Sequence, residues 1–357
     1  MAGPNRAPNA FVRVARRIYN PIGFRKGYNF VLWLIFLGVF LAFSVFRLQY
    51  LDFDGVFCSE IVKSKFNHAA PGECFYFLQK PYKTGIIMHL FCILPAAILA
   101  CVQFVPVIRQ KATIVHRVNG FIVISLSFVG TAGAFVILPR SFGGGLDIQV
   151  VVGTLGASFL WALLMAYLSI QSLQIDKHRK WMLRAWFWAG SIITTRIMQI
   201  ILLKAFDVHP AHYAMPCGKV DSMLHDRTLT VYPECASFYS GENLQQNAVV
   251  RPSLINPTSA AEAAAALDST FGMASFLAFF LHSIGLELYL RLTPGETERL
   301  RDISYKRQRE AGMRVLGSPE RKAKKVSHLE NSSGQRPPSA YAGVWLGEID
   351  ENDPYYL

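Results

Sequence analysis

The sequence predicts an all-α polytopic membrane protein, a six-transmembrane-helix bundle with both termini in the cytoplasm. Three observations support this prediction. Only 17% of the 357 residues are charged and 52% are hydrophobic, whereas a soluble globular chain carries about 25% charged residues. The apolar residues gather into blocks long enough to cross a bilayer as helices. The basic residues lie between alternate blocks, which also accounts for the formal net charge of +12 without nucleic-acid binding.

Six segments meet the length requirement for a membrane span. Each has 20 to 25 residues, and a helix that rises about 1.5 Å per residue then covers about 30 Å of hydrocarbon. The segments are residues 29–48, 84–107, 118–138, 149–173, 182–206 and 268–291. No small-residue cleavage site follows the first segment, so we expect an uncleaved span rather than a signal peptide.

Lysine and arginine predict the orientation of the spans. Residues 1–28 carry six basic residues and no acidic residue, and the loops 108–117 and 174–181 are basic as well. The segments 51–83, 139–148 and 207–267 are balanced or acidic. Because cytosolic loops carry the excess of basic residues, we expect both termini and the second and fourth loops in the cytosol.

This topology divides the chain into three parts. Residues 1–28 form a basic cytosolic N-terminal segment. Residues 29–292 form the six-helix transmembrane domain, with external loops at 49–83 and 207–267. Residues 293–357 form a cytosolic tail, basic at first and then rich in Ser, Pro and Gly, a composition typical of disorder. Within the last external loop, the run from Ala260 to Ala266 predicts a helix that leads into the sixth span.

Four of the six cysteines lie in the predicted external loops, where disulfides form. These are Cys58, Cys74, Cys217 and Cys235. Three pairings are possible, and the sequence does not distinguish them. The sequon at Asn331 lies in the predicted cytosolic tail, so we expect it to stay unglycosylated.

Polar groups inside the spans are the first candidates for function, because they are costly in hydrocarbon. The candidates are His89, Arg196, Gln199, His282 and Glu287. Arg196 and Gln199 are three residues apart and share a helix face. Arg196 lies near the middle of its predicted span and needs an acceptor, for which Glu287, a ligand anion and helix carbonyls are the alternatives. Glu287 is also close enough to the cytosolic interface to reach it beside Arg291.

Each candidate also has a purely structural alternative. His89 and His282 are expected either to take part in proton transfer or to hydrogen-bond a neighbouring helix. Two further pairs, His116-Arg117 and His178-Arg179, follow cytosolic loops. They are expected either to bind a phosphate-bearing substrate or to anchor the helix ends at the interface.

Three kinds of function fit this composition. A b-type haem oxidoreductase needs two histidines at one depth, but His89 and His282 are predicted to differ in depth by roughly 13 Å. A transporter of a small lipophilic or anionic metabolite needs only a bundle and a binding residue such as Arg196, although the sequence lacks paired broken helices. An intramembrane enzyme needs an acid in an apolar cavity. Protonation of a polyprenyl chain then starts a cyclisation, and aromatic rings stabilise the carbocation. No aspartate-rich diphosphate or metal motif is present, and no cofactor is expected.

Short motifs in the second to fifth spans carry a resemblance to a known family. They are the segment from Lys83 to Leu94, the step His116-Arg117-x-x-Gly120, and the motif His178-x-x-Trp181-Met182-x-x-Ala185. They are similar to a widespread family of uncharacterised polytopic membrane proteins. Within it, residues 25–292 resemble the fungal membrane-bound terpene cyclases of meroterpenoid pathways, such as those of ascofuranone and macrophorin biosynthesis.

The resemblance implies cyclisation of a farnesyl chain on an aromatic, often orsellinate-derived, core. It also implies location in the endoplasmic reticulum or another endomembrane, with pathway enzymes in the same bilayer. The site residues come from the physical reasoning above. We predict His89, His282 or Glu287 as proton donor or relay, and Arg196, Gln199, His116, Arg117 and His178 as substrate-binding residues.

Overall fold

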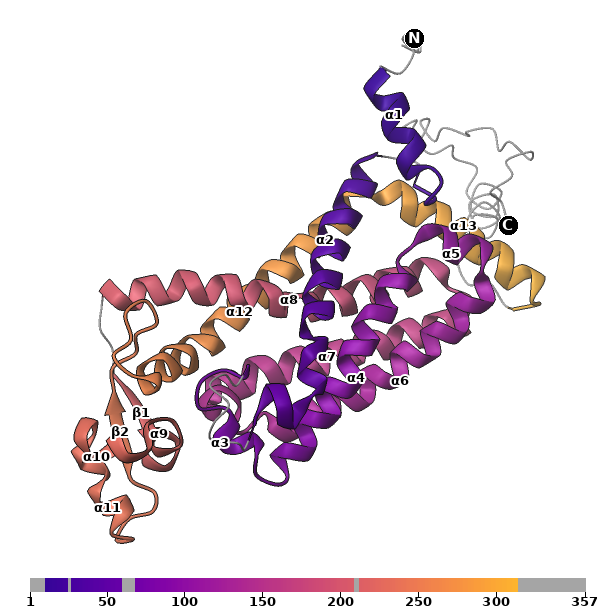
Figure 1. Ribbon diagram of the computed structural model, residues 1–357. Coiled ribbons are helices and arrows are strands. Elements are labelled where there is room, and N and C mark those ends of the chain that lie inside the picture. The colour runs from indigo at the N-terminus through magenta and orange to yellow at the C-terminus, as the bar shows by residue number, and fades with distance from the viewer. Residues whose placement is uncertain (1–9, 25–26, 60–67, 209–211, 314–357) are drawn as a thin grey trace, which may run out of the picture. The chain divides into compact units, whose positions relative to one another are not determined.

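The computed structural model describes residues 10–24, 27–59, 68–208 and 212–313 (Figure 1). Helices account for nearly all of the regular structure in these residues. The longer ones are α1 (Ala10–Tyr19), α2 (Gly27–Phe46), α4 (Tyr82–Gln103), α6 (Thr113–Ile137), α7 (Leu146–Gln171), α8 (Ile175–Val208), α12 (Ala260–Leu292) and α13 (Pro294–Glu310). The short helices are α3 (Cys74–Phe77), α5 (Pro106–Lys111), α9 (Cys217–Leu224), α10 (Thr228–Val231) and α11 (Ala236–Tyr239). Two strands, β1 (Tyr213–Pro216) and β2 (Asn247–Val250), pair in antiparallel fashion.

Six of these helices are long and apolar enough to cross a membrane, and they confirm the six predicted spans. They cover residues 27–51, 82–103, 113–137, 146–171, 175–204 and 260–292. The fifth begins at Ile175 rather than near residue 182. The sixth begins at Ala260, because the alanine run continues its helix, as predicted. Helices extend beyond the apolar stretch at both places, so hydropathy alone does not mark their ends.

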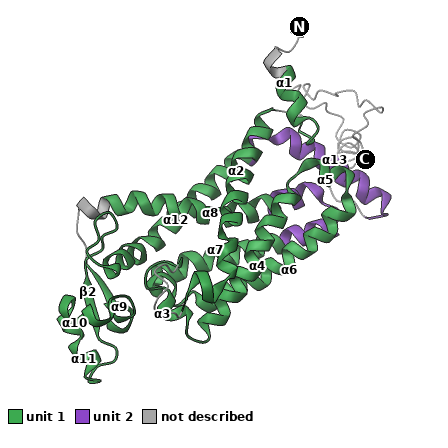
Figure 2. Cartoon of the chain, viewed as in Figure 1, with its two compact units in different colours: residues 1–164, 182–289 green, residues 165–181, 290–357 purple. Residues whose placement is uncertain are grey.

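The chain divides into two compact units (Figure 2). Unit 1 comprises residues 1–164 and 182–289, and unit 2 comprises residues 165–181 and 290–357. Unit 2 contains α13, whose Ser304 Oγ accepts a hydrogen bond from the Ile175 N–H at 2.9 Å and donates one to Asp176 at 3.1 Å. The part of the tail predicted to be disordered lies mostly beyond residue 313, outside the described residues.

Glycines allow α4 and α6 to pack closely in unit 1. A Cβ added to Gly133 would lie 2.7 Å from the backbone nitrogen of His89 and 2.6 Å from the carbonyl oxygen of Gly85. A Cβ added to Gly130 would lie 3.1 Å from the backbone nitrogen of Ile93. Small residues at such positions let two membrane helices approach backbone to backbone, and this contact fixes the second and third spans against each other.

Three segments join consecutive spans: residues 52–81, 138–145 and 205–259. The first and the last each carry one disulfide, and we call the three together the disulfide end. The disulfides join Cys58 to Cys74 and Cys217 to Cys235, which resolves the three pairings left open by the sequence. One buried apolar cluster includes Tyr50, Phe53, Phe57, Phe77, Ile86, Leu90 and Ile137. This cluster packs the first of these segments against α4 and the C-terminal end of α6.

The last segment of the disulfide end folds into a small ordered insert. Its hairpin pairs Tyr213 with Val250 and Pro216 with Asn247, and Figure 1 shows α9, α10 and α11 gathered beside the two strands. A second buried cluster contains Met215, Cys217, Val220, Tyr232, Cys235, Ala248, Val250, Ala261, Ala264 and Ala265. The alanine run of α12 therefore forms one wall of the core of this insert.

Candidate functional site

His89 lies at the contact between α4 and α6. Its Nδ1–H donates to the carbonyl oxygen of Gly130 at 2.8 Å. This is the helix-to-helix hydrogen bond that the sequence offered as the structural alternative for this residue. Its predicted part in proton transfer stays a prediction.

His282 and Glu287 bind α12 to α8. The Nδ1–H of His282 donates to the carbonyl of Phe187 at 2.6 Å, and its Nε2 lies 2.8 Å from the hydroxyl of Thr194. Both ring nitrogens are therefore engaged. The carboxylate of Glu287 accepts two hydrogen bonds from Arg184, at 2.7 and 3.0 Å. Of the three acceptors predicted for Arg196, Glu287 is thus paired elsewhere.

Arg196 and Gln199 share a face of α8, as their spacing predicts. The guanidinium donates to Gln199 Oε1 at 2.8 Å, and Gln199 Nε2 donates to the Leu267 carbonyl at 3.3 Å. The depth of Arg196 near the middle of the span stays a prediction, because α8 begins before the predicted span with a polar stretch.

The remaining predicted binding residues lie in different units. His116 and Arg117 belong to the start of α6 in unit 1, where Arg117 is exposed and the His116 carbonyl accepts from Gln103 at 2.8 Å. His178 belongs to unit 2, and its Nδ1–H donates to the Ala166 carbonyl at 2.9 Å. The structure describes no shared site for them.

The most unusual polar cluster is one that the sequence did not single out. Lys219 is fully buried at the start of α9, and Glu73 and Asp268 are 2% and 3% exposed. The Lys219 ammonium donates to Asp268 Oδ2 at 2.7 Å and to Glu73 Oε1 at 3.3 Å. The backbone N–H of Phe142 donates to Glu73 Oε2 at 2.9 Å. We call Glu73, Lys219 and Asp268 the buried network.

Local structure explains how these groups are held. Glu73 directly precedes Cys74, and Lys219 follows Cys217 by two residues, so each disulfide fixes one member of the network. Phe142 has a φ of 48°, a left-handed conformation that costs a non-glycine residue about 1–2 kcal/mol. Gly143 and Gly144 continue this turn at φ 80° and 64°, which glycine adopts without that cost.

The electrostatics of the network leave one carboxyl group ready to hold a proton. Burial raises the pKa of Glu73 from 4.5 to about 7, against the opposing charge of Lys219, and the charge of Asp268 raises it further. Burial also disfavours the charged form of Lys219, but Asp268 and Glu73 outweigh burial and raise the pKa of the ammonium. Near neutral pH the network therefore contains a charged lysine and a Glu73 carboxyl close to its titration point.

Aromatic rings line the same region. Phe142 and Phe271 stack with ring centroids 3.9 Å apart and planes within 5° of parallel. The Arg196 guanidinium lies 5.0 Å from the Phe142 ring centroid and 5.4 Å from that of Phe271. Phe142 thus contacts the buried network through its backbone and Arg196 through its ring. Phe271 follows Asp268 by one helical turn on α12.

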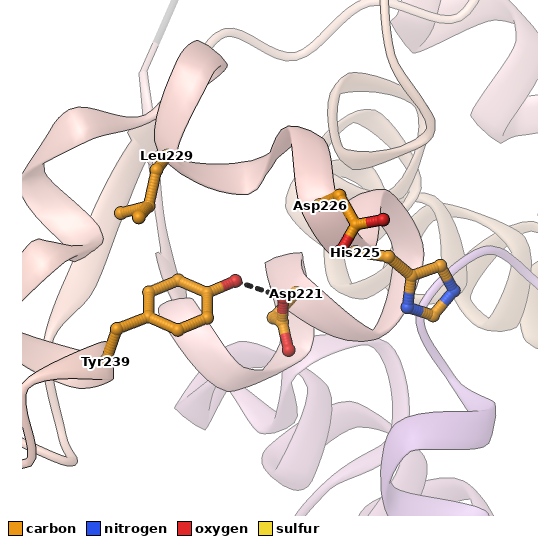
Figure 3. A pocket seen from close by; sticks show the side chains of 5 residues that line it. All are labelled: Asp221, His225, Asp226, Leu229 and Tyr239. Carbon is orange, nitrogen blue, oxygen red and sulfur yellow. Dashed lines mark hydrogen bonds between the residues drawn. The ribbon is translucent and has the colours of Figure 1, made fainter.

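A separate pocket of about 440 Å³ lies in the insert. Figure 3 shows its lining side chains, Asp221, His225, Asp226, Leu229 and Tyr239, with the Tyr239 hydroxyl hydrogen-bonded to Asp221. Asp221 follows Lys219 by two residues on α9, a spacing that points side chains in different directions. Lys219 accordingly faces the interior, while the pocket opens to solvent.

The buried network left only weak signals in the sequence. Asp268 is the first residue of the predicted sixth span, and it therefore counted as a boundary residue rather than as a group inside it. Glu73 and Lys219 lie in loops without periodicity, 146 residues apart. Their closeness to candidate disulfide cysteines was the one available indication.

Comparisons with known proteins support the membrane class. The profile of a family described as "Predicted membrane protein (DUF2306)" matches residues 86–216, which cover most of the second span and the third to fifth. The Ava biosynthesis cluster protein G of Aspergillus versicolor is 25% identical to the chain over 137 residues, 36% of this chain and 40% of that protein. The chain thus matches about two fifths of the length of this curated relative.

No solved structure matches the chain. Terpene cyclase activity is a finer assignment than either match and stays a prediction. Length, apolar composition and the family match agree on the broader class. The chain is an integral membrane protein that crosses the lipid bilayer several times.

Proposed function

We propose that the chain is an integral membrane terpene cyclase of meroterpenoid secondary-metabolite biosynthesis. It cyclises a prenylated (farnesyl) aromatic, or the terminal epoxide of one, by protonation, in the endoplasmic reticulum or another endomembrane. The observation that carries this proposal is the buried network, in which two carboxyl groups share one ammonium. The likeness to a protein of a biosynthesis cluster supports the metabolic setting.

Glu73 is the member of the network suited to act as the acid. Asp268 lies closer to the Lys219 ammonium, at 2.7 Å against 3.3 Å for Glu73, so Asp268 is the better-paired carboxylate. Burial raises the pKa of Glu73 to about 7, so the carboxyl is protonated in a large fraction of molecules at neutral pH. A carboxylic acid is also a far stronger acid than a neutral imidazole, which favours Glu73 over His89 and His282.

The proposed reaction is an isomerisation without a cofactor. The Glu73 O–H bond breaks as its proton passes to the terminal alkene carbon or to the epoxide oxygen. The carboxylate left behind accepts hydrogen bonds from Lys219 and from the Phe142 N–H, which stabilise its new charge. The carbocation closes the rings with the alkenes of the chain and finally loses a proton to a carboxylate. In this proposal, the rings of Phe142 and Phe271 stabilise the cation through their quadrupoles.

Conversion of a defined substrate by microsomes that contain the full-length chain tests this function. The probes are farnesylated orsellinic acid and its terminal epoxide, and the readout is a product of unchanged mass with a new retention time. We expect Glu73→Gln to abolish conversion, because the amide has no acidic proton. The matched control is Glu242→Gln, which changes an exposed glutamate of the insert.

The same assay compares the acids predicted from the sequence. We expect His89→Ala, His282→Ala and Glu287→Gln to lower conversion less than Glu73→Gln does. Full conversion by Glu73→Gln would refute the acid assignment, and no conversion of either probe by the wild type would refute cyclisation of these substrates. A product that differs by two hydrogens would indicate redox chemistry instead.

The pH dependence of conversion provides a second test. Glu73 must be protonated to act, and its folded-state pKa is about 7. We therefore expect conversion to be greatest below this pH and to fall about tenfold per unit well above it. A pH profile that stays flat from pH 6 to pH 9 would contradict a role for Glu73 as the acid.

A further inference from the structure

α2 packs beside α8 in unit 1, where Phe36 contacts Phe187 and Phe40 lies next to Gly190. Arg47 lies seven residues beyond Phe40 and Arg196 six beyond Gly190, so the two arginines lie at a similar level, and the described residues give neither a carboxylate partner. Within the described residues, the contacts of Arg196 are to Gln199 and to the rings of Phe142 and Phe271. Those of Arg47 are to aromatic rings, with its guanidinium carbon 4.7 Å from the Phe43 centroid and 5.0 Å from that of Tyr50. Neither guanidinium forms an ion pair in this part of the chain.

The two guanidinium groups share one environment. Both guanidinium groups are positively charged and repel each other, and that of Arg47 lies over the Tyr50 ring. Within the described residues, the buried Nε–H of Arg47 has no hydrogen-bond acceptor. A buried donor without an acceptor is uncommon in native proteins, and two like charges beside hydrocarbon are costly. An anion between the two guanidinium groups would accept a hydrogen bond from the Arg47 Nε–H and offset the repulsion of the two positive charges.

We propose that Arg47 and Arg196 form the binding site for an oxyanion of an amphipathic ligand, which is the carboxylate headgroup of the prenylated aromatic. This assignment of the substrate class rests on the proposed function. Arginine suits the role because its planar donor fork matches a carboxylate and its face stacks on aromatic rings. The Arg196 guanidinium lies against such a ring pair, the stacked Phe142 and Phe271.

The position of the pair fits a ligand that reaches the buried network. Phe142 lies between Arg196 and the buried network, since its ring contacts Arg196 and its N–H donates to Glu73. An anionic headgroup held by the arginines would therefore bring the attached prenyl chain to the rings of Phe142 and Phe271, beside Glu73.

Equilibrium binding to the purified full-length chain in detergent micelles tests this inference. The probes are radiolabelled farnesylated orsellinic acid and its methyl ester, which lacks the carboxylate. We expect the wild type to bind the acid about tenfold more tightly than the ester, or better, as expected for charge-assisted hydrogen bonds. Arg196→Gln and Arg47→Gln should each remove most of this preference, and Arg196→Lys should keep part of it.

Lys204→Gln is the matched control, because Lys204 is an exposed cation on the same helix as Arg196. We expect it to keep the preference of the wild type for the acid. Thermal unfolding of each variant verifies that it is folded. Equal binding of acid and ester by the wild type, or an unchanged preference in both glutamine variants, would overturn the inference.

Competition separates a substrate headgroup from a lipid headgroup, the other source of an oxyanion. Dioleoyl phosphatidate that displaces the acid no better than dioleoyl phosphatidylcholine would support the substrate assignment. Displacement by phosphatidate alone, dependent on both arginines, would overturn it in favour of lipid. Recovery of the bound probe unchanged would refute cyclisation and leave the anion site standing. Cyclisation with no preference for the acid would do the reverse.

Discussion

Lys219 places one positive charge between two carboxyl groups that have almost no contact with water. A buried ion pair adds little stability compared with apolar residues of the same size, but the loss of one partner leaves an uncompensated charge. The three side chains come from the turn directly before α3, from α9 and from α12. The network therefore links three distant parts of the chain through one ammonium group.

We expect Lys219→Met to lower the free energy of unfolding by about 3–5 kcal/mol, because it leaves two buried carboxyl groups without a counter-charge. Thermal unfolding in detergent at pH 7 measures the effect. The double variant Lys219→Met/Asp268→Asn should recover part of the loss, since one carboxyl is then gone. Lys83→Met is the control. It breaks the Lys83–Asp54 pair, whose aspartate is exposed, and such pairs contribute about 0–1 kcal/mol. Equal losses in both lysine variants would contradict the special role of Lys219.

At the level of single residues, the sequence predicted pairs on one helix better than contacts between segments. The hydrogen bond between Arg196 and Gln199 follows from helical spacing. The contacts of Glu73 with Lys219 and of Arg184 with Glu287 join residues more than 100 positions apart. Such contacts depend on how loops and helices pack in three dimensions, which no local pattern records.

The packing of α4 on α6 depends on elements that present backbone rather than side chains to each other. Gly133 lies where a methyl group would meet backbone atoms of α4 at under 3 Å. Backbone atoms do not yield as flexible side chains do. The same contact positions His89 to donate to the Gly130 carbonyl.

We expect Gly133→Ala to lower the free energy of unfolding by about 1–3 kcal/mol, the usual cost of overpacking. Gly38→Ala on α2 is the matched control, because a Cβ there meets nothing within 4 Å. Alanine favours a helix over glycine by about 1 kcal/mol, so this control should be neutral or stabilising. Unfolding curves of both variants in the same detergent decide the matter, and a neutral Gly133→Ala would show that the helices separate easily.

Element number and type were predictable, and element ends were not. The six apolar segments each overlap one long helix, because bilayer thickness sets a minimum apolar length. The start of α8 is polar, with Asp176, Lys177 and Arg179, and polar residues continue a helix as readily as apolar ones. The helix therefore begins before residue 182, the predicted start of the fifth span.

The orientation of the whole chain in the membrane is still a prediction of its charge distribution. If both termini are cytosolic, the insert between α8 and α12 lies on the opposite side of the membrane, in the lumen of the proposed endomembrane compartment. Both disulfides are in the segments predicted to be external, which agrees with an oxidising compartment. A modification that occurs only in the lumen tests the orientation directly.

We expect Gln245→Ser to cause glycosylation of Asn243, because it completes an Asn-x-Ser sequon on an exposed turn of the insert. Expression with microsomes should give a band of higher mass that a glycosidase removes. Gln245→Ala is the control and should give no shift. The natural sequon at Asn331 should remain unmodified in both variants. Glycosylation at Asn331 instead of Asn243 would reverse the predicted orientation.

The residues of the buried network all lie outside the region that matches the membrane-protein family, residues 86–216. If one of the three segments were replaced by that of a relative without the network, Lys219 would lack a carboxylate or the carboxylates would lack Lys219. A buried charge without a partner is destabilising, so such a replacement would be selected against. We therefore expect Glu73, Lys219 and Asp268 to be inherited together or lost together. Their positions form a searchable signature: an acid directly before the second loop cysteine, a lysine two residues after the third, and an acid near the start of the last span. Genomes could be sorted by this signature into chains that carry the acid and chains that share only the scaffold.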